Sequence, residues 1–343
     1  MEVTQALKQD FEKTPWKDDI ASGELTRAQP RIREVAPSMV QLVPFERYLS
    51  RVCRALEAAE AGRVWQQADA DRRANLLTCG GPGTGQFWTR VPRSPLEHLP
   101  NAHWRQCVLS RLDVRPQFGE KRCQLCRPDD PPGEVCGTML ANTHRHSELC
   151  KKGAARMRSH GHVAAALVQL AAGVGMTADL ERYVPELYEK LGTPSGEIRT
   201  RKAIMDVVLG VPGLETHLLI DVSIRSVAAS RYAGAAAGQA AIAGEKEKLK
   251  RYGPSVLPLV FEAGGRLGKT SLESLQTVVS TAASARLCSS FAASRWRSRL
   301  ERAVLFGTAD AALRAAGADT AQTLHATQFS VATFPLPCAT GRF

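Results

Sequence analysis

The sequence has no uninterrupted apolar run of about 18 residues, so no transmembrane helix and no membrane partner are expected. Its first 20 residues are charged and lack an apolar centre, so a secretory signal is not expected. The nine cysteines are an odd number, and without an export signal they indicate a reducing, intracellular compartment. In such a compartment, clustered cysteines bind metal more often than they form disulfides.

The composition is that of a folded protein with an excess of positive charge. Hydrophobic residues make up 44% of the 343 residues and charged residues 23%, which excludes wholesale disorder. The formal net charge is +11, from 45 lysines and arginines against 34 aspartates and glutamates. This sign favours a polyanionic partner and argues against a protein specialised for acidic peptides or small cations.

Composition and periodicity divide the chain into six segments. These are a flexible leader at 1–42, a helical region at 43–120, a cysteine-rich module at 121–153, a core at 154–265, C-terminal helices at 266–325 and a tail at 326–343. The core begins with a pattern typical of a helix at 154–174. Three strand-length apolar runs follow, AIMDVVL (203–209), HLLIDVSI (217–224) and VLPLVFE (256–262), with an alanine-rich helix at 235–252 before the third. Alternating helices and strands of this kind predict an α/β fold.

Cysteines and histidines gather in a stretch of the chain that is too poor in apolar residues to build its own core. The candidates are Cys123, Cys126, Cys136, His144, His146 and Cys150. Zinc takes four sulfur or nitrogen ligands in a tetrahedron, and a C-x2-C pair supplies two thiolates from one tight turn. We expect Cys136, His146 and Cys150 to bind zinc, with Cys123 or Cys126 as the fourth ligand and the remaining candidates as spares.

Two of the apolar runs each contain one carboxylate, Asp206 in AIMDVVL and Asp221 in HLLIDVSI. A buried, unpaired carboxylate is costly, so such a group is paired, protonated or bound to a metal. If the two strands are neighbours, both carboxylates can point to one place. Two carboxylates and water suit Mg²⁺, which can activate water and neutralise a phosphodiester.

A lysine-rich helix, GEKEKLKRY (244–252), is the third element of this hypothesis. Lys246 and Lys250 lie on one helical face and Lys248 lies roughly opposite, so not all of them can reach one site. A lysine beside a phosphate stabilises developing negative charge. The alternative is a helix face exposed to solvent.

The order of these elements resembles the C-terminal region of non-long-terminal-repeat retrotransposon proteins that carry a restriction-like endonuclease of the PD-(D/E)xK fold. The similarity covers about residues 75–300. The segments that carry it are GPGTGQFWTRVP (81–92), CGTML (136–140), HSELCKKG (146–153), RSHGH (158–162), the two strand aspartates and the lysine helix that ends in Tyr252.

This resemblance implies a restriction-endonuclease-like core, a mixed sheet flanked by helices, with a zinc-stabilised N-terminal module and extra flanking helices. It implies a nuclear, retroelement-derived DNA endonuclease that cleaves phosphodiesters with Mg²⁺ and has structural zinc. Asp206 would be the first metal ligand and Asp221 the second, with Lys248, or alternatively Lys246, as the catalytic lysine. Ser223 stands where the general motif has its lysine, so the lysine is expected from the helix.

The zinc module and the basic residues Lys151, Lys152, Arg156 and Arg158 are expected to contact the DNA backbone, with RNA as a further partner. We interpret His160 and His162 as polar residues at the start of a helix.

Two other functions compete with the nuclease. One is a nucleic-acid-binding protein without catalytic activity. The other is a nucleoside triphosphatase that uses AGGRLGKT (263–270), with Lys269 on the phosphates and Thr270 on Mg²⁺.

Overall fold

The computed structural model describes residues 62–80, 84–85, 98–111, 121–125, 131, 134–140, 145–152, 155–192, 198–215, 217–232, 235–289 and 292–318. The predicted leader at 1–42 and the predicted tail at 326–343 lie outside these residues, as do Cys126 and His144. The described residues from Ala70 onwards belong to one compact unit, which contains all the elements below.

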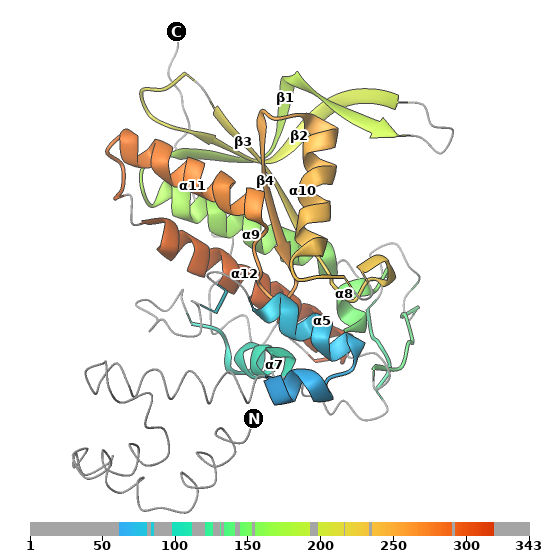
Figure 1. Ribbon diagram of the computed structural model, residues 1–343. Coiled ribbons are helices and arrows are strands. Elements are labelled where there is room, and N and C mark those ends of the chain that lie inside the picture. The colour runs from blue at the N-terminus through green and yellow to red at the C-terminus, as the bar shows by residue number, and fades with distance from the viewer. Residues whose placement is uncertain are drawn as a thin grey trace, which may run out of the picture. The chain divides into compact units, whose positions relative to one another are not determined.

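The described part of this unit is mixed α/β (Figure 1). In chain order its elements are helices α5 (Ala70–Cys79), α7 (Asn101–Arg111), α8 (His146–Leu149) and α9 (Ala155–Ala172), strands β1 (Thr177–Gly192), β2 (Ile198–Gly210) and β3 (His217–Arg225), the short 3-10 helix η4 (Ser230–Tyr232), helix α10 (Gln239–Tyr252), strand β4 (Val256–Glu262), and helices α11 (Lys269–Ser284) and α12 (Ala292–Ala315). The predicted α/β class is confirmed.

The four strands form one mixed sheet in the order β1-β2-β3-β4. β1 pairs antiparallel with β2 along nearly its whole length, whereas β2 pairs antiparallel with β3 only through Val207–Gly210. β3 and β4 are parallel, and α10 provides the crossover that parallel neighbours require. Much of the β1–β2 hairpin therefore extends past the rest of the sheet (Figure 1).

All three apolar runs are strands, as predicted, but β1 was not expected. Its sequence, TADLERYVPELYEKLG, has charged residues throughout and a proline, because an edge strand with few buried side chains needs little apolar content. Leu180 and Tyr183 are both exposed. β1 is a strand because its backbone pairs with β2. The local sequence pattern of β1 does not predict this pairing.

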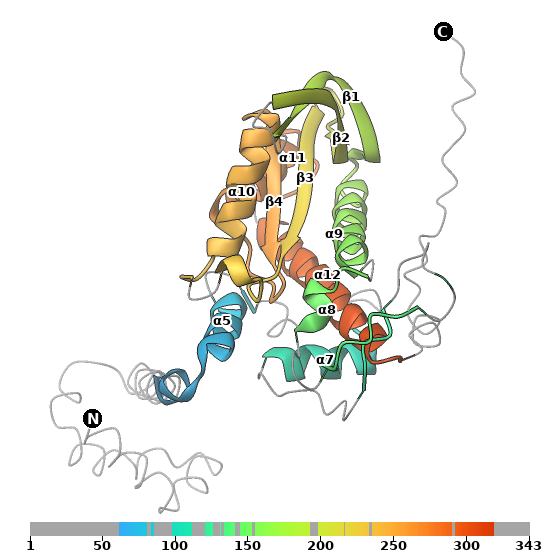
Figure 2. The ribbon, with the colours of Figure 1, turned by 90° about the vertical axis from the view of Figure 1, so that its right-hand side faces the viewer.

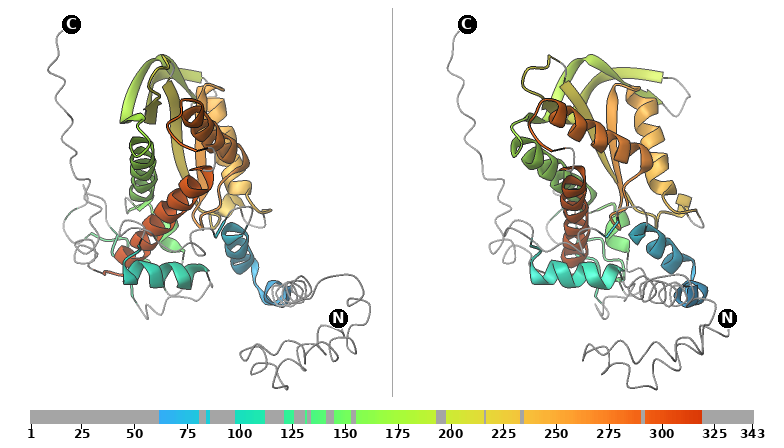
Figure 3. Two further views of the ribbon diagram at one scale, coloured as in Figure 1. Left: turned by 90° about the vertical axis from the view of Figure 1, so that its left-hand side faces the viewer. Right: turned by 60° about the vertical axis from the view of Figure 1, so that its left-hand side comes forward.

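Helices cover both faces of the sheet (Figures 2 and 3). α10 packs on one face, while α9, α11 and α12 share a hydrophobic core with the other. Helices α11 and α12 belong to the predicted C-terminal segment, yet they bury Val278, Trp296 and Leu300 in this core. The helices after residue 265 are thus part of the same packed body as the sheet.

α10 lies unusually close to the sheet at Gly244. A Cβ atom at this position would lie 2.7 Å from Val260 Cγ1 and 3.1 Å from Arg225 Nε. Only glycine leaves room for this approach, which sets the height of the lysine helix above β3 and β4.

The described part of the cysteine-rich module packs on the C-terminal end of α12. Arg122 and Met139 form an antiparallel bridge, and the amide of Gln124 donates to the carbonyl of Ala315 at 2.9 Å. Leu125 and Leu140 are buried in a small cluster with alanines of α12. Among the described helices, none is long and apolar enough to cross a membrane.

Candidate active site and metal centre

Asp206 and Asp221 lie at the point where β2 separates from β3. The last pair of that ladder is Val207 with Ile220, so one further step along the register places Asp206 opposite Asp221. The ladder does not continue there. Instead, Oδ2 of Asp206 accepts a hydrogen bond from the amide of Val222 at 2.6 Å. The two strand aspartates are therefore brought together, as the sequence predicted.

Lys248 is the lysine of α10 that reaches this position. Its Nζ lies 2.7 Å from Oδ1 of Asp221, and the two side chains are only 11% and 4% exposed. Lys246, the alternative, is exposed to solvent. The difference follows from the helical spacing, because residues two apart on a helix face different ways.

His160 is a member of the site that the sequence did not reveal. It comes from the second turn of α9, and its Nε2 lies 2.9 Å from Oδ2 of Asp206. The predicted role as a polar residue at a helix start was incomplete, since the imidazole pairs with a strand carboxylate. No spacing in the sequence links the two residues. Only the packing of α9 beside the sheet brings them into contact.

The two carboxyl groups differ in their affinity for protons. Burial raises the pKa of Asp221 to about 7, with the adjacent Asp206 adding to the rise and Lys248 opposing it. Burial acts on Asp206 too, but the hydrogen bonds around it outweigh this effect and its pKa lies below the ordinary value. The hydrogen bond to Asp206 raises the pKa of His160. The site thus combines one ionised carboxylate with one carboxyl that titrates near neutral pH.

The donor set fits a hard divalent cation. Oδ1 of Asp221 faces Lys248, whereas its Oδ2 is buried and accepts from no nitrogen or hydroxyl donor of the described residues. When Asp221 is protonated, it hydrogen-bonds to Asp206. Asp206 directs Oδ2 toward His160 and Val222. A buried carboxylate oxygen without a donor, next to a second carboxylate, is the environment that a cation such as Mg²⁺ would satisfy.

Strained backbone occurs beside this site. Glu181 of β1 has a φ of 50°, in the left-handed region that residues other than glycine rarely adopt. The pairs Leu180 with Val207 and Arg182 with Met205 flank it, so Glu181 stands opposite Asp206 across the β1–β2 ladder. Such strain is commonly found at functional sites.

Four cysteine and histidine side chains converge in the module next to α12. One ligand atom from each of Cys123, Cys136, His146 and Cys150 lies within 4.8 Å of the others. Sγ of Cys123 is 4.0 Å from Sγ of Cys150, and Sγ of Cys136 is 3.3 Å from Nε2 of His146. Zn–S bonds of about 2.3 Å in a tetrahedron imply sulfur separations of about 3.8 Å. This cluster can hold a metal ion, and among the described residues Cys123 is its fourth member; the alternative, Cys126, lies outside them.

Two thiols of this cluster differ in their affinity for protons. Cys123 is fully buried, and burial raises its pKa to about 12. Burial acts on Cys136 as well, but hydrogen bonds from Thr138 outweigh it and lower the pKa of that thiol. A metal that bound here would displace the protons and take up the charge.

The basic residues expected to contact DNA are not equally available. Lys151 is exposed, but Lys152 pairs with Glu134 at 2.5 Å. Nε of Arg158 lies 3.7 Å from Oδ2 of the buried Asp310 on α12, so this arginine lies against the protein. The side chain of Arg156 lies outside the described residues.

The segment 263–270 does not form an open phosphate cradle. Residue 261 bridges residue 267 in a tight turn, and a carboxylate already occupies the start of α11. Oε1 of Glu245 accepts from both the amide and the hydroxyl of Ser271, each at 2.7 Å. Lys269 is exposed. This geometry does not favour the nucleotide-binding alternative, because an internal carboxylate takes the donors that a phosphate would need.

Comparisons with protein-family models, with curated proteins and with solved structures found no match to this chain.

Proposed function

We propose that this chain is a metal-dependent DNA endonuclease with a restriction-like core. The observation that carries the proposal is the meeting of Asp206, Asp221 and Lys248 where β2 separates from β3. The order of helix, three antiparallel strands, lysine helix and parallel strand also agrees with the resemblance described above. The net charge of +11 suits a polyanionic substrate.

In this proposal Asp206 and Asp221 hold Mg²⁺. The ion would lower the pKa of a bound water and neutralise charge on the scissile phosphate. Water adds to phosphorus, one P–O bond to a sugar breaks, and the departing oxygen takes a proton. In this proposal the protein contributes by holding the metal ion and the scissile phosphate in place during this hydrolysis.

Each residue of the site has a separate task. His160 and the amide of Val222 fix the Asp206 carboxylate in one orientation, because both bond to the same oxygen. Lys248 offers its ammonium group beside Asp221, where it can stabilise negative charge that develops on the phosphate. Gly244 keeps α10 close enough to the sheet for that ammonium to reach the site.

We further propose that Cys123, Cys136, His146 and Cys150 bind structural zinc. The supporting observation is the donor set, three sulfurs and one imidazole nitrogen in a closed cluster. Metal at this place would join the strand-like segment around Cys123 to α8 and hold both against α12.

Nicking of a supercoiled plasmid by the purified full-length protein tests the nuclease. We expect Mg²⁺-dependent nicking that Asp221→Ala and Lys248→Ala abolish. Asp179→Ala and Lys246→Ala are matched controls, because both residues are exposed and lie on β1 and α10, respectively. Equal nicking by wild type and Asp221→Ala would refute the site. Salt-sensitive DNA binding without nicking would support the non-catalytic alternative instead.

A further inference from the structure

Exposed apolar side chains gather on the β1–β2 hairpin, beside the candidate active site. Tyr183 and Tyr188 of β1 are 43% and 52% exposed, and Ile204 of β2 is 59% exposed. All three lie in the part of the hairpin that extends past the rest of the sheet (Figure 1). Single exposed apolar residues are ordinary, but a group of them on one element points to a binding surface.

These three side chains lie on one face of the hairpin. Tyr183 is the direct partner of Ile204 in the β1–β2 ladder, and Tyr188 is the partner of Lys202. Directly opposite residues of an antiparallel pair point to the same side, and so do residues two apart on one strand. The face therefore contains Tyr183, Tyr188, Lys202 and Ile204, and we call it the tyrosine face.

The tyrosine face is on the same side of the sheet as the candidate active site. Met205, the residue after Ile204, is fully buried in a cluster against which Tyr252 of α10 packs. Ile204 consequently points to the opposite side, from which α9 brings His160 to Asp206. Ile204 precedes Asp206 by two residues, which is about 7 Å along a strand. The tyrosine face thus begins next to the two aspartates and continues along the hairpin.

The tyrosine face offers the two kinds of contact that bind a single nucleic acid strand. Nζ of Lys202 lies 5.4 Å from the centroid of the Tyr183 ring, so an ammonium group stands beside an exposed aromatic ring. Exposed aromatic rings stack on nucleobases, and lysines contact the phosphates between them. Of the four residues of this face, one is a cation and none is an acid, which suits a polyanion.

The exposed rings favour bases that are unpaired. In an intact double helix each base is stacked between its neighbours, and taking it out of the stack costs free energy. This cost is lowest where the nucleotide is already single-stranded. Two exposed rings beside the candidate active site therefore favour a strand whose bases are free to stack on them.

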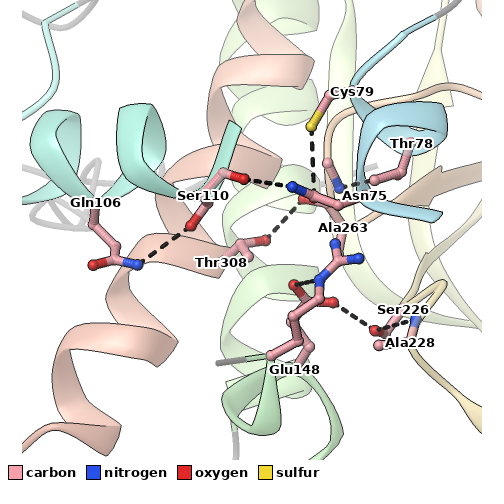
Figure 4. Close-up of polar contacts among 12 residues, drawn as sticks. Asn75, Thr78, Cys79, Gln106, Ser110, Glu148, Ser226, Ala228, Ala263 and Thr308 are labelled. Atoms are coloured by element: carbon pink, nitrogen blue, oxygen red, sulfur yellow. Dashed lines mark hydrogen bonds and ion pairs between the residues drawn. The ribbon is translucent and has the colours of Figure 1, made fainter. Parts of the chain in front are cut away.

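Polar side chains at the other end of this unit bond to one another instead. Nδ2 of Asn75 on α5 donates to the carbonyl of Ser110 on α7 at 2.7 Å (Figure 4). The hydroxyl of Ser226, just after β3, donates to Oε2 of Glu148 on α8 at 2.5 Å (Figure 4). These contacts join elements of the protein, whereas the rings of the tyrosine face are open to a ligand.

We propose that the tyrosine face binds unpaired nucleotides next to the scissile phosphate, with bases stacked on Tyr183 and Tyr188 and a phosphate beside Lys202. The proposal rests on the nuclease function for the position of the scissile phosphate, but not for the binding itself. It names the preferred substrate as DNA with a single-stranded stretch rather than an intact duplex.

Fluorescence anisotropy of labelled oligonucleotides with the full-length protein, without Mg²⁺ so that no strand is cleaved, tests the binding. We expect Tyr183→Ala and Tyr188→Ala each to weaken binding of a short oligothymidine strand about five- to a hundredfold, the loss expected for one stacked base. Their affinity for a duplex of the same length should change little. Leu214→Ala is the matched control, because Leu214 is 48% exposed but lies in the turn between β2 and β3.

Tyr183→Phe separates loss of stacking from loss of folding, because it keeps the ring. We expect this variant to bind the single strand like the wild type, and all the variants to keep the melting temperature of the wild type. Undiminished single-strand binding by both alanine variants, or equal losses for single strand and duplex, would overturn the proposal. A dimer that the alanine variants dissociate while DNA binding is unchanged would also overturn it, since the face would then bind a second copy of the chain.

Cleavage in Mg²⁺ distinguishes failure of this proposal from failure of the nuclease. We expect the wild type to cleave a duplex with an unpaired flap faster than a fully paired duplex, and Tyr183→Ala to lose this preference. Equal cleavage of both substrates by the wild type would overturn the preference and leave the nuclease in place. Absence of all cleavage, together with single-strand binding that Tyr183→Ala loses, would refute the nuclease and still support the tyrosine face as a site for unpaired nucleotides.

Discussion

Asp221 should make the stability of this protein depend on pH in a direction opposite to that of most carboxylates. Its pKa rises from 3.8 to about 7 in the folded protein, mainly because it is buried. Between these values the folded state holds a proton that the unfolded state has lost. The free energy of unfolding therefore falls as the pH rises through this window.

The size of the effect follows from the shift. One pKa unit corresponds to 1.36 kcal/mol, so the penalty from Asp221 should grow by about 2–3 kcal/mol between pH 5 and pH 8. Asp221→Asn cannot ionise, although its oxygen can still accept a hydrogen bond from Lys248. Relative to this variant, the wild type should lose about 2–3 kcal/mol of stability over the same interval.

Urea denaturation followed by circular dichroism, without added Mg²⁺, measures this difference. Asp179→Asn on β1 is the control, because its carboxylate is exposed and should change the pH dependence little. If the free energy of unfolding changed with pH in the same way for wild type and Asp221→Asn, the reasoning would be refuted. That result would show that the Asp221 carboxyl has the same pKa in the folded and unfolded states.

If Mg²⁺ binds at this site, it should offset the loss of stability that the ionised Asp221 causes. At pH 8 and about tenfold above the dissociation constant, Mg²⁺ should stabilise the wild type by about 1.4 kcal/mol. Asp221→Asn should respond much less. An equal response in both proteins would mean that the ion binds elsewhere.

Three further changes test other parts of the structure. Cys150→Ser should lower the zinc content, measured by atomic absorption, from about one ion per chain, whereas Cys288→Ser, outside the cluster, should leave it unchanged. Equal zinc in both would contradict the assigned ligands. Gly244→Ala should destabilise the protein by about 1–3 kcal/mol in urea, because the new methyl group would meet Val260 at 2.7 Å. An unchanged unfolding midpoint would show that α10 can move away. Glu245→Gln should cost about 1–2 kcal/mol, since it weakens the charge-assisted bonds at the start of α11. Stability equal to that of the wild type would show that the charge of Glu245 contributes nothing.

The sequence by itself determined the elements whose signal is local. Apolar runs of strand length lie in β2, β3 and β4 because these strands are buried, and burial requires apolar side chains whatever their neighbours are. The spacing of cysteines and histidines likewise predicted a metal cluster, because structural zinc ligands typically come in pairs that are close together in the chain. The helical period also separated Lys248 from Lys246.

Tertiary structure alone decided what depends on contacts between distant segments. Strand β1 is an exposed edge whose pairing partner determines its conformation, so its own sequence carries little strand signal. His160 meets Asp206 only because α9 packs beside the sheet. The periodicity of apolar residues shows which face of a segment is buried. It does not show which residue of another segment that face contacts, because this depends on how the segments pack.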